Sequence, residues 1–124
     1  MLVITLNRAK DTRITIGDFL TLIVVDWEVG GNSVRLALET TIEIPIVREE
    51  AILKEGYKNI PRKGNLVLTR REGERLLIGD DITITVKSVT CSNVRIGIDA
   101  PKNLSILRKV VETETFIEGI FSVL

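Results

Sequence analysis

Few side chains in this sequence are of the types that carry chemistry. The adjacent carboxylates Glu49-Glu50 and Asp80-Asp81 are candidates for acid/base catalysis, but a helix start and a turn are places where carboxylates serve as capping groups. Histidine is absent and Cys91 is the single cysteine, so the chain has no imidazole relay, no imidazole metal ligand and no internal disulfide. Its glycines form no phosphate-binding motif. The sequence therefore predicts a protein that is not an enzyme and that uses no metal ion or cofactor.

The basic residues leave two interpretations open. Arg70, Arg71 and Arg75 surround one turn, and Arg48 and Arg108 each end a predicted strand. Adjacent strand residues point to opposite faces, so Arg70 and Arg71 cannot share one flat surface. The few aromatic residues do not form the interleaved platform of base-stacking proteins. The arginines are either solvated charges of edge strands or contacts to an RNA that is read by hydrogen bonds and backbone groups.

Composition and length describe an ordinary soluble domain. The chain has 124 residues, and its 17 Lys+Arg balance its 17 Asp+Glu, which argues against a strongly basic nucleic-acid coat but allows a local basic patch. The longest hydrophobic-rich run without charges, Phe19 to Val25, is far shorter than the ~20 residues of a membrane helix. The N-terminus lacks the features of a signal peptide. We expect a cytoplasmic protein without membrane contact.

An internal repeat organises the chain. Ile16–Asp18 recurs as Ile78–Asp80, 62 residues later, and Val34–Leu38 recurs in similar form as Val94–Ile98, 60 residues later. The change of offset corresponds to two extra residues in each of two loops of the first copy, and insertions in loops are typical of a true duplication. The predicted organisation is a first repeat over residues 1–57, a linker over 58–64 and a second repeat over 65–124.

Each copy is predicted to contain five short strands and a terminal helix. Apolar and polar residues alternate over Ile82 to Lys87 and over Val94 to Asp99, which is typical of half-buried antiparallel strands. The other predicted strands are 2–6, 13–16, 20–28, 33–39, 44–48, 66–71, 75–78 and 104–108. Strong helix formers predict a helix over 49–55, and the tail after Arg108 fits a helix or a strand, with the helix preferred. A single copy of about 60 residues would be marginally stable, so the two copies should share one core.

Several of these residues carry a resemblance to a known family. Leu66–Glu74 followed by Ile78–Asp80, and then Val94–Lys102 and Ser105–Arg108, resemble the carbon storage regulator (CsrA/RsmA) family. The resemblance implies a mainly β fold, with two interleaved five-stranded units that form an intrachain pseudo-dimer of small antiparallel sheets, each followed by a short helix. It also implies an RNA-binding regulator that recognises GGA-containing hairpins in mRNA leaders and usually represses translation. Small decoy RNAs or a protein antagonist are further partners that it suggests.

In this family an RNA site combines the first strand of one subunit with the fifth strand of the other, which implies two unequal sites here. The first site would contain Leu68, Thr69, Arg70, Arg71, Ile46, Val47 and Arg48. The second, weaker site would contain Ile4, Thr5, Leu6, Asn7, Arg8, Ile106 and Arg108. Leu6 and Asn7 stand in place of two arginines, and Arg8 compensates only in part. The resemblance thus implies one intact and one degraded site, and one hairpin RNA for each chain.

A second function class stays open alongside RNA binding. The chain would then be a protein-binding or antagonist module that keeps the fold and has lost most RNA affinity. The apolar tail from Phe116 to Leu124 favours this reading, because apolar patches mark contact surfaces. The same tail would also serve to cover the core or to allow further dimerisation.

Overall fold

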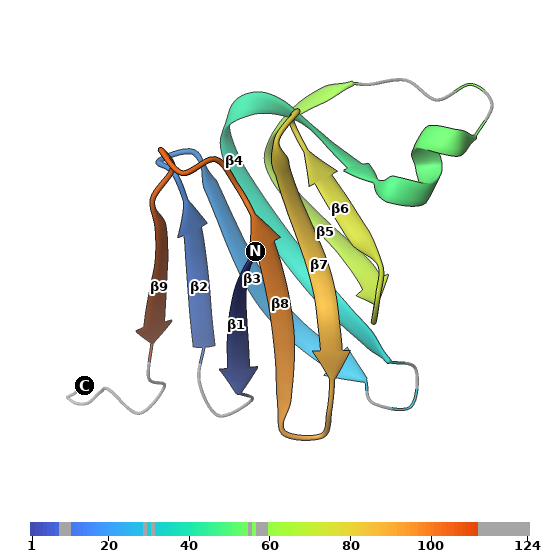
Figure 1. Ribbon diagram of the computed structural model, residues 1–124, viewed down its shortest axis with the longest axis vertical. Helices are drawn as coiled ribbons and strands as arrows, with labels where there is room; N and C mark the ends of the chain where they lie inside the picture. Colours follow the sequence, from blue (N-terminus) through green and yellow to red (C-terminus); the bar gives the residue numbers. More distant parts are fainter. Residues whose placement is uncertain (8–10, 29, 31, 55, 57–59, 112–124) are drawn as a thin grey trace.

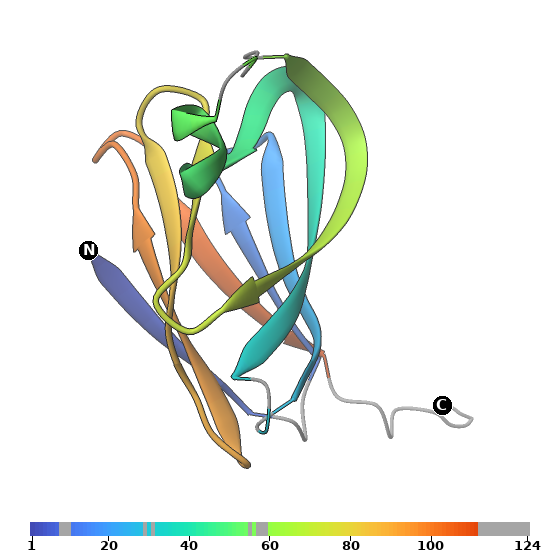
Figure 2. The same cartoon turned by 90° about the vertical axis from the view of Figure 1, so that its right-hand side faces the viewer.

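The structure, a computed structural model, describes residues 1–7, 11–28, 30, 32–54, 56 and 60–111. The described residues form the strands β1 (Leu2–Asn7), β2 (Asp11–Ile16), β3 (Leu20–Glu28), β4 (Ser33–Arg48), β5 (Pro61–Arg71), β6 (Arg75–Ile78), β7 (Ile82–Val89), β8 (Asn93–Asp99) and β9 (Ile106–Val111), and the 3-10 helix η1 (Glu49–Leu53). The strands pair antiparallel in the order β1-β8-β7-β6-β4-β3-β2-β9, and β5 pairs with β4. Figures 1 and 2 show how this sheet curls around its own interior. The prediction of a mainly β protein is confirmed.

The core lies inside the curled sheet and is made of aliphatic side chains from both halves of the chain. In β7, Ile82, Ile84 and Val86 are buried, as the alternating pattern predicts. Burying such a side chain contributes roughly 1.5–3 kcal/mol, so a core shared by eight strands dominates the stability of the fold. Trp27 adds a polar link between the halves, because its indole Nε1 donates a hydrogen bond to the carbonyl of Thr90 at 2.9 Å.

The strand order brings edge strands from one half of the chain beside central strands of the other half. β1 pairs with β8, and the last residues of β4, Ile46–Arg48, pair with β6. In the same way β5 pairs with the N-terminal part of β4, and β9 pairs with β2. Neither half could therefore keep its pattern of strand pairing if the other were removed.

Two glycine turns close the two ends of this arrangement in the same way. Gly17 and Gly79 have φ angles of +63° and +61°, in the left-handed region that favours glycine. The amide of Gly17 donates to the carbonyl of Ser105 at 2.8 Å, and that of Gly79 donates to the carbonyl of Pro45 at 2.9 Å. These are the repeated turns recognised in the sequence, and each one bonds to a segment from the opposite half of the sheet.

The helix expected over residues 49–55 is not formed as an α-helix. The chain forms the 3-10 helix η1 instead, without a side-chain hydrogen bond at its N-cap residue Arg48. No residue of η1 is buried, and Leu53 is 90% exposed. Short helices depend on packing of an apolar face, so the helix-forming residues do not suffice here. The second expected helix, in the C-terminal tail, lies outside the described residues.

Two other boundaries differ from those predicted. The strands expected at 33–39 and 44–48 are one continuous strand, β4, whose pairing with β5 changes register between Thr40 and Ile44. The expected linker over 58–64 lies in part within β5, because Pro61 pairs with Pro45 and Arg62 with Ile44. A long neighbouring strand supplies the partner that local sequence cannot reveal. Within the described residues no helix is long and apolar enough to span a membrane.

Candidate functional site

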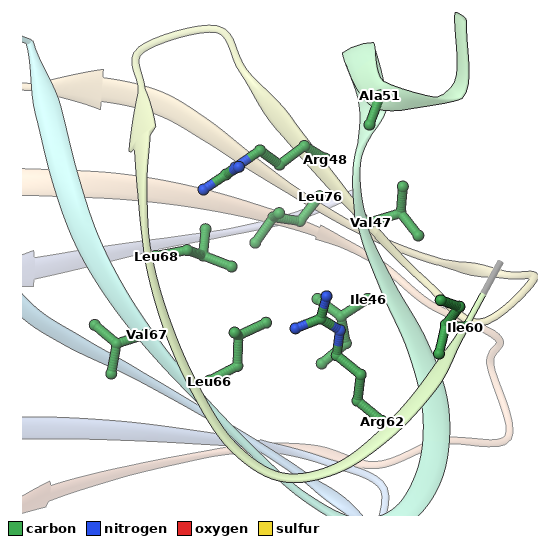
Figure 3. Close-up of a pocket in the computed structure, with 10 residues that line it drawn as sticks. All are labelled: Ile46, Val47, Arg48, Ala51, Ile60, Arg62, Leu66, Val67, Leu68 and Leu76. Carbon is green, nitrogen blue, oxygen red and sulfur yellow. The ribbon is translucent and has the colours of Figure 1, made fainter. Parts of the chain in front are cut away.

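A cavity of about 350 Å³ lies between β5 and the C-terminal end of β4 (Figure 3). β4 forms this place because its N-terminal part pairs with β5 while its last residues pair with β6, in the other part of the sheet. The residues that line the cavity are Ile46, Val47, Arg48, Ala51, Ile60, Arg62, Leu66, Val67, Leu68 and Leu76. The structure thus brings together Leu68 and Ile46–Arg48, which are four of the seven residues predicted for the first site.

Arg70 lies beside this cavity and is committed to an internal ion pair. Its side chain is 4% exposed, and its Nη1 and Nη2 donate to the two carboxylate oxygens of Glu50 at 2.9 and 2.6 Å. Nη1 also donates to the carbonyl of Arg75 at 3.1 Å, and Glu74 lies 3.7 Å from Nη2. Hydrogen bonds from Arg70, followed by the backbone amide of Glu50, lower the pKa of the Glu50 carboxyl from 4.5 to about 2. The predicted site residue Arg70 therefore holds η1 against β5 and β6.

Thr69 and Arg71, the other predicted residues of β5, occupy its opposite face. Both are exposed, whereas Leu68 and Arg70 are buried, as expected for alternate residues of one strand. Thr69 lines a separate depression together with Arg35 from β4. Arg71 makes no ion pair with any residue that the structure describes. The predicted first site is consequently divided between an inner face, at the cavity, and an outer face.

The predicted second site involves β1 and β9, the two ends of the strand order. On β1, Ile4 and Leu6 are buried, with exposed fractions of 7% and 2%, whereas Thr5 and Asn7 are exposed. In the repeat, Leu6 occupies the position of Arg70. This edge therefore has a buried leucine where the other edge has a buried ion pair.

The β9 part of the second site offers one exposed basic residue and an apolar neighbour. Arg108 is exposed and lies opposite Ile14 of β2, and Ile106 is half-buried opposite Ile16. Leu107, between them, is 64% exposed. Arg8, the residue expected to compensate for the missing arginines, lies outside the described residues.

The second half of the chain matches a known family. The model of CsrA, described as a global regulator protein family, matches residues 66–115. The translational regulator CsrA of Clostridium botulinum is 59% identical over 49 residues, which are 40% of this chain and 68% of that protein. The chain belongs to the CsrA family. The CsrA of Thermotoga maritima is 51% identical over 55 residues, which are 44% of this chain and 66% of that protein.

The family also answers the question of catalysis. CsrA proteins are translational regulators and not enzymes, in agreement with the prediction from the sequence. No solved structure matches the chain at a significant level. The CsrA match begins at Leu66, so one wall of the cavity, from β5, lies inside it, and the other wall, with Arg48, lies outside it.

Sequence reasoning missed two charged residues at this site of the CsrA-family chain. Glu50 was interpreted as a capping carboxylate, yet it is the partner of Arg70 on another strand. Arg62 was assigned to a linker, yet it lines the cavity. The basic residues between 58 and 64 were a weak signal for Arg62. The partner of a buried arginine has no signal in a single sequence, because the pairing arises only when η1 packs beside β5.

Proposed function

We propose that this CsrA-family chain binds RNA in the cavity between β5 and the end of β4, and that it controls translation of the mRNAs it binds. The observation that carries this proposal is the convergence of Leu68 with Ile46–Arg48 around one cavity, from segments that lie far apart in the sequence. Among the residues that line the cavity are two arginines and no carboxylate. Arginines bind phosphates in bidentate form, and apolar side chains accept the flat faces of bases.

The proposed ligand is a GGA-containing hairpin in an mRNA leader, and repression of translation is the expected outcome. The CsrA relatives carry the name translational regulator, and the resemblance noted in the sequence supplies the ligand class. In this proposal Arg48 contacts a phosphate and the apolar residues Ile46 and Leu68 contact the nucleotide. Thr69 and Arg71 extend the contact over the outer face of β5, and Arg70 positions the strand by holding Glu50.

We further infer that the chain is a fusion of two CsrA-like units that form a pseudo-dimer within one chain. The exchange of edge strands between the two halves supports this view. So do the equivalent turns, in which Gly17 bonds to Ser105 and Gly79 bonds to Pro45, since Pro45 and Ser105 stand 60 residues apart like other repeated positions. A single chain should then be the folded unit. Light scattering is expected to give the mass of one chain, and a mass of two chains would support dimerisation through the apolar tail.

Titration calorimetry with RNA hairpins tests the RNA-binding proposal. We expect the full chain to bind one hairpin that carries a single GGA, and to bind a control hairpin with CCU in its place at least about tenfold more weakly, which corresponds to about 1.4 kcal/mol. Two equal hairpins for each chain would contradict the degraded second site. Equal affinity for both hairpins would contradict recognition of GGA.

The alternative class, a protein-binding module, is favoured by one observation at the second edge. There Leu6 is buried and Leu107 is 64% exposed, so the edge is apolar where an RNA site needs positive charge. Purification of the chain from cells, followed by sequencing of bound RNA, separates the two classes when it is compared with the double variant Arg48→Ala/Arg71→Ala. RNA that is lost with the double variant supports the regulator, and a protein partner without RNA supports the module.

A further inference from the structure

The segment that connects the two halves of the chain contributes to the sheet and to the cavity. Pro61 and Arg62 pair with Pro45 and Ile44 of β4, so this part of the connection is held in place by strand pairing. Gly64 follows with a φ of +100°, a left-handed conformation that favours glycine. In Figure 2, β5 runs as one long arc past the end of β4. The arc allows Arg62, before the glycine, and Leu66, after it, to line the same cavity.

Arg62 and Arg48 approach this cavity from two sides. Figure 3 shows both guanidinium groups reaching into the space between β5 and β4, one from each strand. The apolar side chains around them are Ile46, Leu66, Leu68 and Leu76. Neither arginine makes an ion pair with a residue in the described part of the chain, in contrast with Arg70, whose charge is matched by Glu50.

Two arginines without a carboxylate, beside an apolar surface, define the chemistry of the ligand. Each guanidinium presents planar donors that fit phosphate oxygens, and it stays charged at every physiological pH. Partial exclusion of water by the apolar walls strengthens the attraction to an anion. The group that satisfies both features is a nucleotide, with its phosphate between Arg48 and Arg62 and its base or sugar against Leu66 and Leu76.

We propose that Arg62, in the connecting segment, is a second phosphate-binding residue of the RNA site and brackets one nucleotide phosphate together with Arg48. This inference rests on the proposed RNA-binding function. Arg62 stands before the residues that match the CsrA family, which begin at 66, so the contribution comes from the connection between the halves. The connection would thereby make the β5 site stronger than the family strands alone.

The variant Arg62→Gln tests this inference, with Lys63→Gln as its matched control. Both changes remove one positive charge from adjacent residues of β5, and Lys63 does not line the cavity. We expect Arg62→Gln to weaken binding of the GGA hairpin to the full chain by about 10- to 30-fold. The slope of log affinity against log salt should also become less steep by about 0.7, as for one lost contact to a single strand. Lys63→Gln should stay within about twofold of the unchanged protein, since a solvated charge off the site acts only through long-range attraction.

Other outcomes separate this inference from the function on which it rests. If Arg62→Gln binds as tightly as Lys63→Gln while Arg48→Gln loses binding, the bracketing role of Arg62 is wrong and RNA binding at the cavity stands. If the unchanged protein binds no hairpin RNA, or binds an acidic peptide in the cavity instead, both proposals fall. Arg62 is exposed, and thermal unfolding of each variant should match that of the unchanged protein, which separates loss of contact from loss of fold.

Discussion

The two outer edges of the sheet solve one structural problem in different ways. On β5, the inward position holds Arg70, which is 4% exposed and is neutralised by Glu50. On β1, the equivalent position holds Leu6, which is 2% exposed. The residue 60 positions after Glu50 is Val110, so the sequence replaces both members of the ion pair with apolar residues.

This difference teaches that the fold does not need the arginine. Replacing a buried ion pair with apolar residues of similar volume is often neutral or stabilising, whereas removal of one partner alone is costly. The β1 edge can therefore lose its charges and keep its packing. What it loses is positive charge beside β9, where Arg108 remains as the exposed basic residue of the described part of that edge.

Leu6→Arg should produce the largest effect, because it breaks the comparison at its core. An arginine at this buried position would lie against Ile4 and the aliphatic core without a partner like Glu50. We expect the free energy of unfolding to fall by about 3 kcal/mol or more, measured by urea denaturation. Thr5→Arg, at the exposed neighbouring position, is the control and should change stability by less than about 0.5 kcal/mol. Equal destabilisation by both variants would contradict the idea that burial decides the outcome.

Arg48→Ala and Arg108→Ala compare the two strands that end in arginine. Arg48 lines the cavity, so its loss should weaken binding of the GGA hairpin by about 10- to 100-fold, or about 1–3 kcal/mol. Arg108 belongs to the degraded edge, and its loss should change affinity by less than about threefold. A gel-shift series with both variants measures the order. Greater loss with Arg108→Ala would reverse the assignment of the two edges.

Glu50→Gln should have an intermediate effect on stability. It leaves the guanidinium of Arg70 buried with a neutral partner, and we expect a loss of about 1–2 kcal/mol after allowing for the half-exposed position of Glu50. The double variant Glu50→Val/Arg70→Leu copies the pair of residue types at the other edge. It should unfold at nearly the same urea concentration as the unchanged protein. Further loss of stability in the double variant would show that the charged pair has no apolar substitute at this edge.

The smallest effect concerns pH. Because Arg70 lowers the pKa of Glu50 from 4.5 to about 2, the folded state binds this proton less readily than the unfolded state does. The pair therefore contributes stability above about pH 4.5, and this contribution is lost as the pH falls toward 2. The difference in urea midpoint between the unchanged protein and Glu50→Gln should be full at pH 7 and close to zero near pH 2. A difference that does not depend on pH would contradict an ionic origin.

Local pattern sufficed for the central strands and their turns. The alternation in β7 and β8, and the repeated turns at Gly17 and Gly79, follow from side-chain direction in strands and from the conformational freedom of glycine. The merging of two predicted strands into β4 and the strand character of Pro61–Gly64 did not follow. Each of these depends on a partner strand that is distant in sequence, and local propensities are blind to such partners.

For the site, the sequence by itself determined which strands carry the arginines and that the two edges are unequal, since Leu6 and Asn7 stand where Arg70 and Arg71 stand in the repeat. The tertiary structure alone decided the role of each arginine. It buries Arg70 against Glu50 and directs Arg62 into the cavity. The physical reason is that a charge is free to bind a ligand only where the fold leaves it without an internal partner, and such partners come from segments that meet only in the folded chain.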